Sequence, residues 1–449
     1  MEQEQNKTQR KKPNALKKIL LAAAAVAAAV LLFLAGYFTY YLTLDGGLRS
    51  LLWFKDKVQS DYYQEIGDDE FWQAAIDGAE TLLDQYSCYY TAEEYDAVVN
   101  SDKGIKTGTG MSFFGNTNKL YKIAINSPLF YTGKASAGMF LTGVGSSEQT
   151  IADTFTSSAV EEQLASFNEG DTAVLRFSET AADDTQNCEI VTVTLRTYTE
   201  SFVLYAAGGR AYANICEGDE DEGVWTDVSA YVSEDELVAG DAAYIRLVQF
   251  SGNAAKEFDR AAEQYVQDAK RTLLLDLRND GGGKVSIMQR IASYFLANSK
   301  EKTPVVMTAK YRGDKEEHYL AADNRYAAYF GGSEIYVAAN MNTASASEAL
   351  IGVMISCGAI GYENVFITDT NAESDAPVTT YGKGIMQTTY YNPLTGEAVK
   401  LTTATIYWPN GECIHGEGIS TADGAQASPA ETFADYGDAE LSAILAQIG

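Results

Sequence analysis

The second half of this 449-residue chain alternates short apolar runs with amphipathic stretches, and this pattern restricts its fold more than any other feature. Residues 243–250 and 272–277 have the composition of strands, and each run precedes a stretch with helical periodicity, at 253–269 and 284–297. Strands that alternate with helices are typical of a largely parallel sheet covered by helices. Such sheets bind ligands at the carboxyl ends of their strands. We therefore expect the chemistry of this chain at its strand-to-helix junctions.

The region before this pattern has a different composition. Residues 104–205 hold short β-rich runs and one helical piece at 159–167, which predicts a separate β-rich domain. Residues 45–103 carry apolar and acidic side chains at helical spacing, which predicts a helical neck or cap. The stretch 217–223 has no apolar side chain to bury, so we expect a surface loop within a larger domain at 206–449.

A run of 26 uncharged residues, 19–44, lies near the amino terminus. It exceeds the roughly 20 residues that a helix needs to cross a membrane. The basic tail 1–18 contributes +4 to a chain whose net charge is −29, so we expect the tail in the cytoplasm and the acidic remainder outside the cell membrane. A cleaved signal peptide is the alternative, but its apolar region usually spans only about 7–15 residues. We favour a retained single-pass anchor.

The net charge and the cysteine content exclude several other classes of protein. An acidic body is poorly suited to nucleic acid, whose phosphates attract basic surfaces. The five cysteines show no CxxC spacing, so neither a zinc site nor a complete disulfide framework is indicated. Buried apolar cysteines are the favoured interpretation, although one pair could form a bridge in an oxidising compartment.

The segment TASASE, residues 343–348, joins a predicted strand to an apolar helix. A serine at such a turn, Ser345, can expose its hydroxyl while the amide of Ala346 points toward a developing oxyanion. The alternative is that Ser345 or Ser347 only caps the helix. The chain has two histidines, His318 and His415, so a histidine base has few candidates, and a surface or structural role is favoured for both.

The segment YGKGIMQ, residues 381–387, places Lys383 between two glycines, with Gln387 four residues later. A lysine has a pKa of about 10.4 in water and becomes a useful base only when burial or neighbours disfavour its charged form. The apolar neighbours could exclude water, and Gln387 could orient the amine. The alternative is an ordinary lysine in an exposed turn.

A third segment, LLLDLRNDGGG at 273–283, is an apolar strand that ends in charged residues and three glycines. The order GxxxxGK[ST] is absent, which excludes a phosphate-binding loop of that type. The segment is either a tight turn before a helix or a source of an oxyanion-binding amide, from Gly282 or Gly283.

Together DLRNDGGG, TASASE and YGKGIMQ resemble the carboxyl-terminal processing peptidases, also called tail-specific proteases, over almost everything after residue 44. The resemblance implies a Ser-Lys dyad in which Ser345 is the nucleophile, Lys383 the base and Gln387 the residue that supports the lysine. It implies no metal and no organic cofactor. It also implies a multidomain α+β and α/β architecture, with a PDZ-like domain at 104–205 and a crotonase-like ββα protease core at 206–449.

Several segments depart from the family pattern. Residues 108–114, 126–128 and 159–177 resemble its PDZ domain, but the stretch 137–145 lacks the usual Gly-Asp. Ser345 and Lys383 lie 38 residues apart, which is longer than usual and indicates an insertion within 366–380.

These observations predict a membrane-anchored extracytoplasmic serine endopeptidase that cleaves polypeptides and recognises carboxyl-terminal segments through its PDZ domain. Its expected partners are polypeptide substrates and the membrane, with no nucleic acid and with self-association as an open possibility. The alternative is a membrane-tethered peptide-binding scaffold that keeps an inert protease fold.

Overall fold

The computed structural model describes residues 15–216, 223–238, 240–297, 304–321, 323–368, 376–428 and 438–448. Most of the predicted loop at 217–223 and the middle of the predicted insertion, residues 369–375, therefore lie outside the described residues. The chain divides into two compact units, residues 1–83 and 84–449. The division falls inside the segment 45–103, for which the sequence predicts a helical neck or cap.

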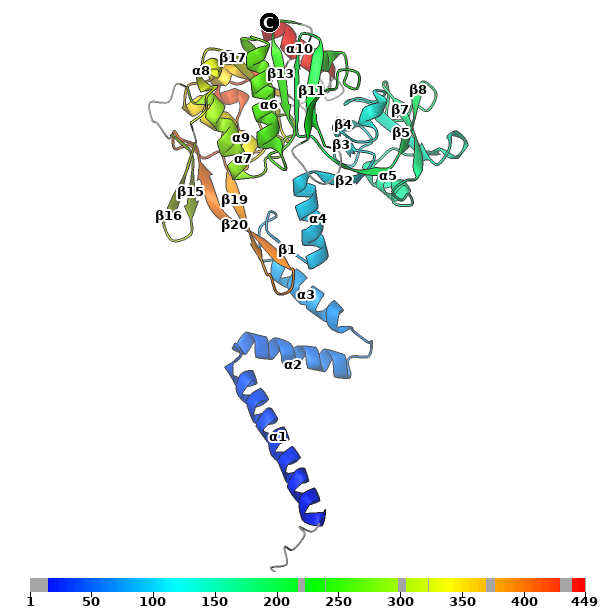
Figure 1. Cartoon of the computed structure of the whole chain (residues 1–449), viewed down its shortest axis with the longest axis vertical. Helices are drawn as coiled ribbons and strands as arrows, with labels where there is room; N and C mark the ends of the chain where they lie inside the picture. Colours follow the sequence, from blue (N-terminus) through cyan, green and yellow to red (C-terminus); the bar gives the residue numbers. More distant parts are fainter. Residues whose placement is uncertain are drawn as a thin grey trace, which may run out of the picture. The chain divides into compact units, whose positions relative to one another are not determined.

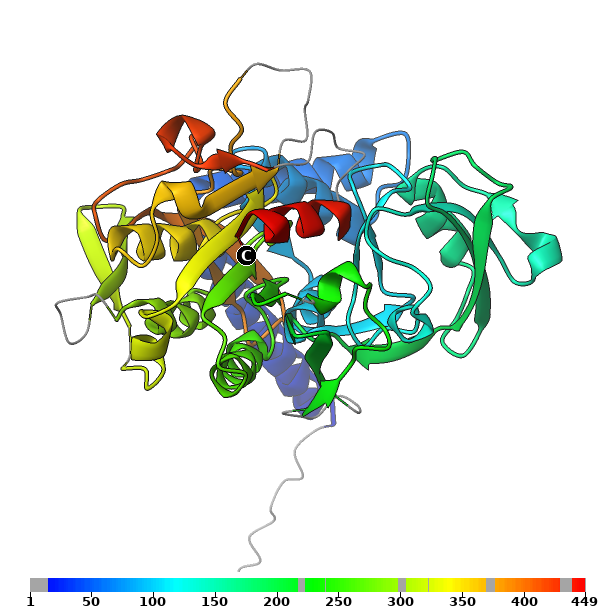
Figure 2. The same ribbon diagram turned by 90° about the horizontal axis from the view of Figure 1, so that it is seen from above.

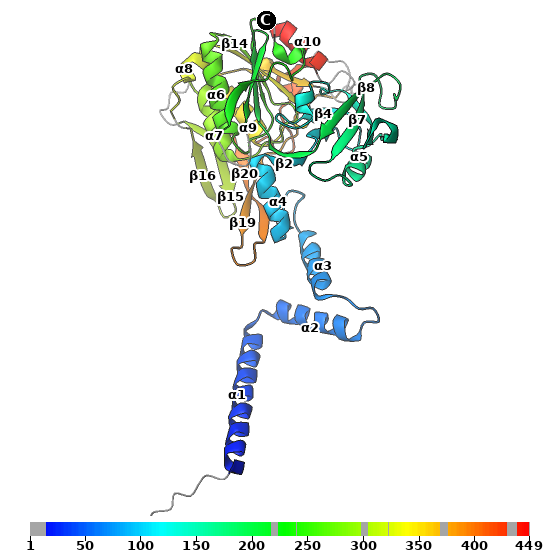
Figure 3. The same ribbon diagram turned by 45° about the vertical axis from the view of Figure 1, so that its right-hand side comes forward.

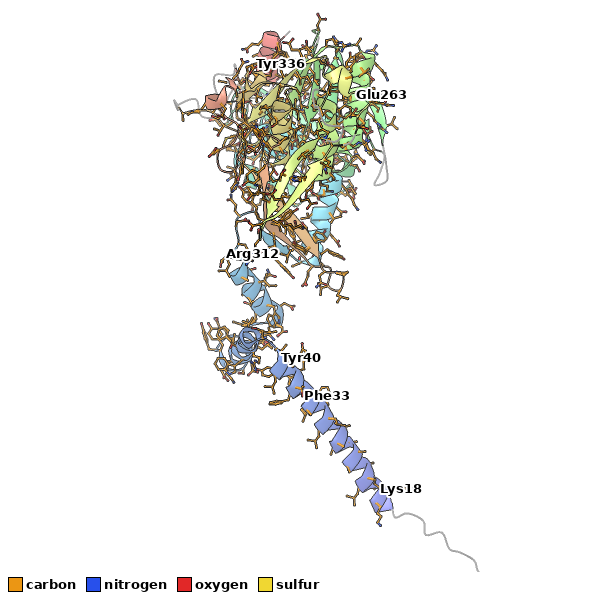
Figure 4. The ribbon with its side chains drawn as sticks, turned by 90° about the vertical axis from the view of Figure 1, so that its left-hand side faces the viewer. Lys18, Phe33, Tyr40, Glu263, Arg312 and Tyr336 are labelled. Carbon is orange, nitrogen blue, oxygen red and sulfur yellow. The ribbon has the colours of Figure 1, made fainter. Side chains whose placement is uncertain are left out.

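The described residues of the first unit form three helices, α1 (Ala15–Thr43), α2 (Gly46–Asp61) and α3 (Asp68–Glu80). Within α1, residues 17–43 are long and apolar enough to cross a membrane, and Figure 4 shows the side chains of Lys18, Phe33 and Tyr40 along it. This helix is consistent with a membrane anchor or with a signal sequence. A capping bond begins α2, because Asp45 Oδ1 accepts the Gly47 N–H at 2.7 Å.

The second unit starts with β1 (Cys88–Tyr90) and α4 (Ala92–Lys103). Thr91 and Glu94 form a capping box at the start of α4, and Gly104, at a φ of 84°, ends the helix in the left-handed conformation. Strand β1 then pairs with a strand from the far end of the chain, β20 (Ala398–Tyr407), which fixes the beginning of this unit against its end.

The β-rich region contains one α-helix, α5 (Ser157–Leu164), which overlaps the helical piece predicted at 159–167. Its strands are β2 (Ile105–Gly108), β3 (Met111–Phe113), β4 (Leu120–Ile123), β5 (Phe140–Gly145), β6 (Ala152–Asp153), β7 (Thr172–Ser178), β8 (Cys188–Thr194) and β9 (Arg196–Thr199). Strands β6, β5, β7 and β8 form one antiparallel sheet, while β2 pairs with β9 and β3 with β4. Leu120, Leu141 and Phe177 belong to a hydrophobic core built wholly from this region.

The main sheet has eight strands in the order β12-β11-β10-β13-β14-β17-β18-β21. They are β10 (Val203–Ala207), β11 (Arg210–Ile215), β12 (Val224–Asp227), β13 (Ala243–Leu247), β14 (Thr272–Asp276), β17 (Glu334–Asn340), β18 (Val365–Thr368) and β21 (Gln426–Ala427). Strands β13 to β21 run parallel, whereas β10 to β12 are antiparallel. The predicted mixed α/β fold is confirmed.

Helices cover both faces of this sheet (Figure 2). One face carries α6 (Ala254–Gln267), α7 (Val285–Ala292) and α9 (Ala346–Ser356), and the other carries α10 (Asp438–Ile448). The side chains of β14 alternate between these two faces. Leu273 and Leu275 belong to the same core as α6, α7 and α9, whereas Leu274 belongs to the same core as α10. A strand buried on both sides has a continuous apolar sequence.

A second sheet has the order β1-β20-β15-β16, with β19 (Ile385–Tyr391) also paired to β20. Its other strands are β15 (Val305–Tyr311) and β16 (Lys315–Leu320), and the short helix α8 (Ala327–Phe330) follows them. Figures 1 and 3 show the two ribbons, β15–β16 and β19–β20, extending beyond the main sheet, with β19–β20 beside α4. Tyr95 of α4 stacks on Tyr391 of β19 at 5.4 Å between ring centres.

The cysteines follow the expectation of burial only in part. Cys216 is buried, whereas Cys88, Cys188, Cys357 and Cys413 are half-buried.

Candidate active site

Ser345 lies on the turn between β17 and α9, at the N-cap position of that helix. Its backbone has a φ of 57° and a ψ of −112°, a combination that residues other than glycine rarely adopt. Strain of this kind is characteristic of functional turns, including those that present a serine nucleophile. Two hydrogen bonds join the turn to the segment that follows β14. Thr343 Oγ1 donates to the Leu277 carbonyl at 2.8 Å, and the Ala344 N–H donates to the Asp280 carbonyl at 3.0 Å.

Glu348 connects this turn to the loop that carries Lys383. Its buried carboxylate accepts hydrogen bonds from the N–H groups of Ser345 at 2.9 Å, Gly382 at 2.7 Å and Lys383 at 2.9 Å. A fourth comes from the Thr380 hydroxyl at 2.5 Å. Burial raises the pKa of Glu348, and these four donors act in the opposite direction because they favour its charged form.

Sequence reasoning missed the role of Glu348. The signal was present, because a serine followed three residues later by a glutamate at the start of a helix is the pattern of a capping box. The bond from the Ser345 N–H supplies one half of that box. The hydrogen bonds from Gly382 and Lys383 to Glu348 join residues that are far apart in sequence, so no local sequence pattern predicts them.

The glycines beside Lys383 are explained by close packing. A Cβ at Gly384 would lie 2.8 Å from the His415 nitrogen, and one at Gly382 would lie 2.9 Å from the Gly418 nitrogen. The backbone of residues 415–418 therefore runs directly along the lysine loop. Both flanking glycines are required by that contact rather than by a flexible exposed turn.

The Lys383 side chain is half-buried. Burial lowers its pKa, and the nearby charge of Lys400 lowers it further, while Asp84 and Glu348 act in the opposite direction. The net effect lowers the pKa of Lys383, so the neutral amine, which is the form that can accept a proton, is reached more easily than for a lysine in water. This is the environment that a lysine base requires.

A single cavity of about 980 Å³ unites the predicted site. It is lined by every residue that the sequence singled out for chemistry, namely Gly282, Gly283, Ser345, Ala346, Lys383 and Gln387. Its lining also includes apolar side chains, among them Met288, Met307, Ala349, Met386 and Ile406. The cavity therefore offers apolar surface on which side chains of a peptide segment can pack.

The glycine run lies against the serine turn. Gly282 has a φ of 93°, and a Cβ there would fall 2.7 Å from both the Ala344 oxygen and the Ala346 nitrogen. The Gly282 N–H donates to Asp280 Oδ1 at 2.8 Å and is therefore already engaged. No hydrogen bond of the Gly283 N–H occurs among the described residues. Of the two expected oxyanion donors, Gly283 is the one with an available amide.

Ser345 and Lys383 share the cavity but are not bonded to each other. Within the described part of the chain, no hydrogen bond joins the Ser345 hydroxyl to Lys383 Nζ. Instead, Lys383 Nζ lies 4.7 Å from the centre of the Tyr86 ring. Gln387 likewise bonds elsewhere, since its Nε2 donates to Thr402 Oγ1 at 3.1 Å.

The side chains of the two histidines lie outside the cavity, although the backbone of His415 packs against Gly384. His318 is exposed on β16, where its Nδ1 is 2.9 Å from Thr308 Oγ1, and His415 is exposed beyond the lysine loop. Neither lines the cavity. Over the described ranges, no group of three or more histidine, cysteine, aspartate or glutamate side chains could hold a metal ion.

Comparison with known proteins gives this geometry a context. Residues 241–359 match the model of peptidase family S41, a range that contains Gly282, Gly283 and Ser345 and ends before Lys383. The chain is 24% identical to a probable CtpA-like serine protease of Staphylococcus epidermidis over 83% of its own length and 64% of the relative's. It is 27% identical to the carboxy-terminal processing protease CtpB of Bacillus subtilis over 42% of its own length and 35% of the relative's.

The chain thus spans less than two thirds of the length of either relative. Among solved structures, a photosystem II D1 C-terminal processing protease aligns with a TM-score of 0.46 and 19% identity, over 84% of this chain and 87% of that one. The chain thus carries a match to peptidase family S41 over residues 241–359, and its sequence is similar to those of carboxy-terminal processing serine proteases.

Proposed function

We propose that this chain is a membrane-anchored extracytoplasmic serine endopeptidase that cleaves polypeptides with Ser345 and Lys383. One observation carries the proposal. A serine on a strained strand-to-helix turn shares a cavity with a lysine whose charged form is disfavoured by burial. The two are tied together through the backbone by the carboxylate of Glu348.

In the proposed reaction, neutral Lys383 accepts the hydroxyl proton as Ser345 Oγ attacks the scissile carbonyl carbon. The oxyanion that forms would be bound by two amides, those of Ala346 and Gly283. Ala346 is the first residue of α9, so its N–H has no acceptor within the helix. The protonated lysine then gives its proton to the leaving amine, and the C–N bond breaks to leave an acyl ester on Ser345.

Water completes the cycle. Lys383, again neutral, takes a proton from the water that attacks the ester, and the acid product leaves as Ser345 recovers its proton. Gln387 would hold the lysine in place, since its Nε2 is anchored on Thr402 and its carbonyl oxygen remains an acceptor for the amine. These steps use water together with side chains and backbone amides of this chain.

Substrate recognition through a PDZ-like domain forms part of the proposal. A cavity of about 520 Å³ lies between the loop before β3 and the end of α5, lined by Gly108, Gly110, Met111, Leu164 and Phe167 among others. The two glycines have φ values of 135° and 94°, and a Cβ at Gly110 would lie 2.2 Å from the Ser127 Cβ. Among the strands that the structure describes, β3 pairs with β4 alone, which leaves an edge to which an extended peptide could add as a strand.

The proposed location follows from α1. Its apolar residues can span the hydrocarbon core, and the basic residues of the tail favour a cytoplasmic amino terminus. The acidic second unit would then lie outside the membrane.

The test compares cleavage of a loosely folded protein by the full chain in detergent micelles with cleavage by Ser345→Ala, Lys383→Ala and Ser347→Ala. We expect losses of at least 1000-fold for the first two, because members of a catalytic unit fail together. Ser347→Ala should keep most of the activity, since Ser347 is buried and donates to the Asp280 carbonyl at 2.9 Å. Undiminished cleavage by Ser345→Ala and Lys383→Ala would refute the dyad.

A peptide-binding scaffold without catalysis is the second candidate. The observation that favours it is the missing bond between Ser345 and Lys383 in the described structure. A serine-reactive fluorophosphonate probe separates the two, because only an activated serine is labelled. Labelling of wild type but not of Ser345→Ala supports the peptidase, whereas peptide binding without labelling supports the scaffold.

A further inference from the structure

Tyr86 covers the amine of Lys383, although the two residues are far apart in sequence. The Tyr86 ring centre lies 4.7 Å from Lys383 Nζ, which is within the range of a cation–π interaction. The lysine has no hydrogen bond to Ser345 in the part of the chain that the structure describes. The ring is thus a group that contacts the amine in this conformation.

Several contacts fix the ring in place. The Tyr86 hydroxyl donates to the hydroxyl of Tyr381, which lies two residues before Lys383, at 3.1 Å. The backbone N–H of Tyr86 donates to Asp84 Oδ1 at 3.0 Å. The next residue is tied to the strand that flanks the lysine, because the Thr402 N–H donates to Ser87 Oγ at 2.9 Å. Beyond it, β1 pairs with β20 with Cys88 opposite Lys400. The segment 84–90 is therefore anchored on the strands next to Lys383.

We propose that Tyr86 is a positioning residue that holds protonated Lys383 away from Ser345 in the resting enzyme and releases it when the lysine becomes neutral. This inference rests on the proposed function, because it assigns Lys383 the role of base. An aromatic ring attracts an ammonium through its quadrupole and has much less attraction for a neutral amine. Loss of the proton to water would therefore free the amine to approach the Ser345 hydroxyl.

Other charged groups face the same amine and define what the ring adds. Lys400 of β20 disfavours the ammonium, whereas Asp84 and Glu348 favour it. Tyr381, the hydrogen-bond partner of Tyr86, is exposed and precedes the lysine on its own loop. The ring adds an attraction that acts on the charged form only, so its removal should make Lys383 easier to deprotonate.

The experiment measures kcat/KM against pH for the full chain in detergent micelles, with a fluorogenic peptide that wild type cleaves. Tyr86 is replaced by Phe and by trifluorinated phenylalanine, which keeps the shape of the ring but weakens its quadrupole. The acid limb of the profile should stay in place for Tyr86→Phe. It should move to lower pH by roughly half a unit to one unit for the fluorinated ring, from the usual size of cation–π interactions.

Because the two rings have nearly the same shape, misfolding does not explain a difference between them. A limb that does not move, or that moves to higher pH, overturns the inference, since the ring would then only exclude water. Tyr381→Phe is the matched control, because it removes the hydroxyl partner of Tyr86 without removing the ring, and its limb should match that of Tyr86→Phe.

Lys383→Ala, measured in parallel, distinguishes this failure from failure of the proposed function. If Lys383→Ala cleaves as well as wild type, the dyad itself is wrong. If Lys383→Ala is inactive and the fluorinated ring leaves the limb unchanged, only the role of Tyr86 is wrong.

Discussion

The two halves of the candidate site are built by different means. The serine half is a backbone structure, in which a strained turn is packed against Gly282 and joined to the main sheet through buried hydrogen bonds. The lysine half depends on a side chain that lies over Tyr86 and beside Lys400, between segments of the second sheet. The difference suggests a preorganised nucleophile and a base whose position and protonation can be adjusted.

Among the variants that test this comparison, Glu348→Ala should have the largest effect, because Glu348 connects the two halves. The substitution removes the acceptor of four hydrogen bonds, two of them buried and two partly buried. Misplacement of catalytic groups by about 1 Å can cost on the order of 100-fold in rate, so we expect at least that loss in kcat/KM. The measurement is steady-state cleavage of a peptide together with thermal unfolding.

Glu348→Gln is the matched variant for this prediction. The carbonyl oxygen of the glutamine can still accept hydrogen bonds, although its NH₂ group cannot. The loss in kcat/KM should therefore be smaller than for Glu348→Ala. Equal activity of Glu348→Ala and wild type would mean that the two halves are held together by other contacts.

Gly282→Ala tests the rigidity of the serine half. A Cβ would clash with the Ala344 oxygen and the Ala346 nitrogen at 2.7 Å, and the φ of 93° adds strain. Because backbone cannot move aside cheaply, we expect roughly a 10- to 100-fold lower kcat/KM. Gly281→Ala is the control, since a Cβ at Gly281 meets nothing within 4 Å. Equal effects of the two substitutions would show that the turn adjusts easily.

Glu257→Gln tests how the sheet beneath the serine turn responds to pH. Burial raises the pKa of Glu257 to about 7, although its carboxylate accepts bonds from Ser201 Oγ, the Phe202 N–H and the Val203 N–H at 2.6–3.1 Å. A raised pKa means that the folded protein holds this proton more tightly than the unfolded chain does. The stabilisation is therefore complete below about pH 4.5 and is lost as the pH rises through 7.

The difference in unfolding free energy between wild type and Glu257→Gln should accordingly decrease from pH 5 to pH 8, by on the order of 3 kcal/mol at most. All three bonds reach one oxygen, Oε2, which the carbonyl oxygen of glutamine can replace. Denaturant unfolding at several pH values measures this. A constant difference would mean that Glu257 has the same protonation in both states.

The sequence was sufficient to place the serine half but only part of the lysine half. Strand β14, the glycine run and the TASASE turn are adjacent because parallel strands present their carboxyl ends at one edge, which local patterns predict. Strand β16 gave no such signal, because nearly all of its side chains are exposed and it is a strand only through pairing with β15. The contact of Tyr86 with the lysine loop joins residues 295 positions apart, which no local pattern encodes.

Lys400→Met should produce the smallest effect and the one that best separates the two halves. Lys400 lines the same cavity as Lys383, and its charge disfavours the ammonium of that lysine. Without it, the pKa of Lys383 should rise, so the acid limb of the pH–rate profile should move to higher pH by about half a unit, because solvent screens the pair. The shift is opposite in sign to the one expected when the Tyr86 ring is weakened. Lys310→Met, which removes an exposed cation outside the cavity, should leave the limb in place. If Lys400→Met also leaves the acid limb in place, neighbouring charges do not affect the pKa of Lys383. The contrast between a fixed serine and an adjustable lysine would then be wrong.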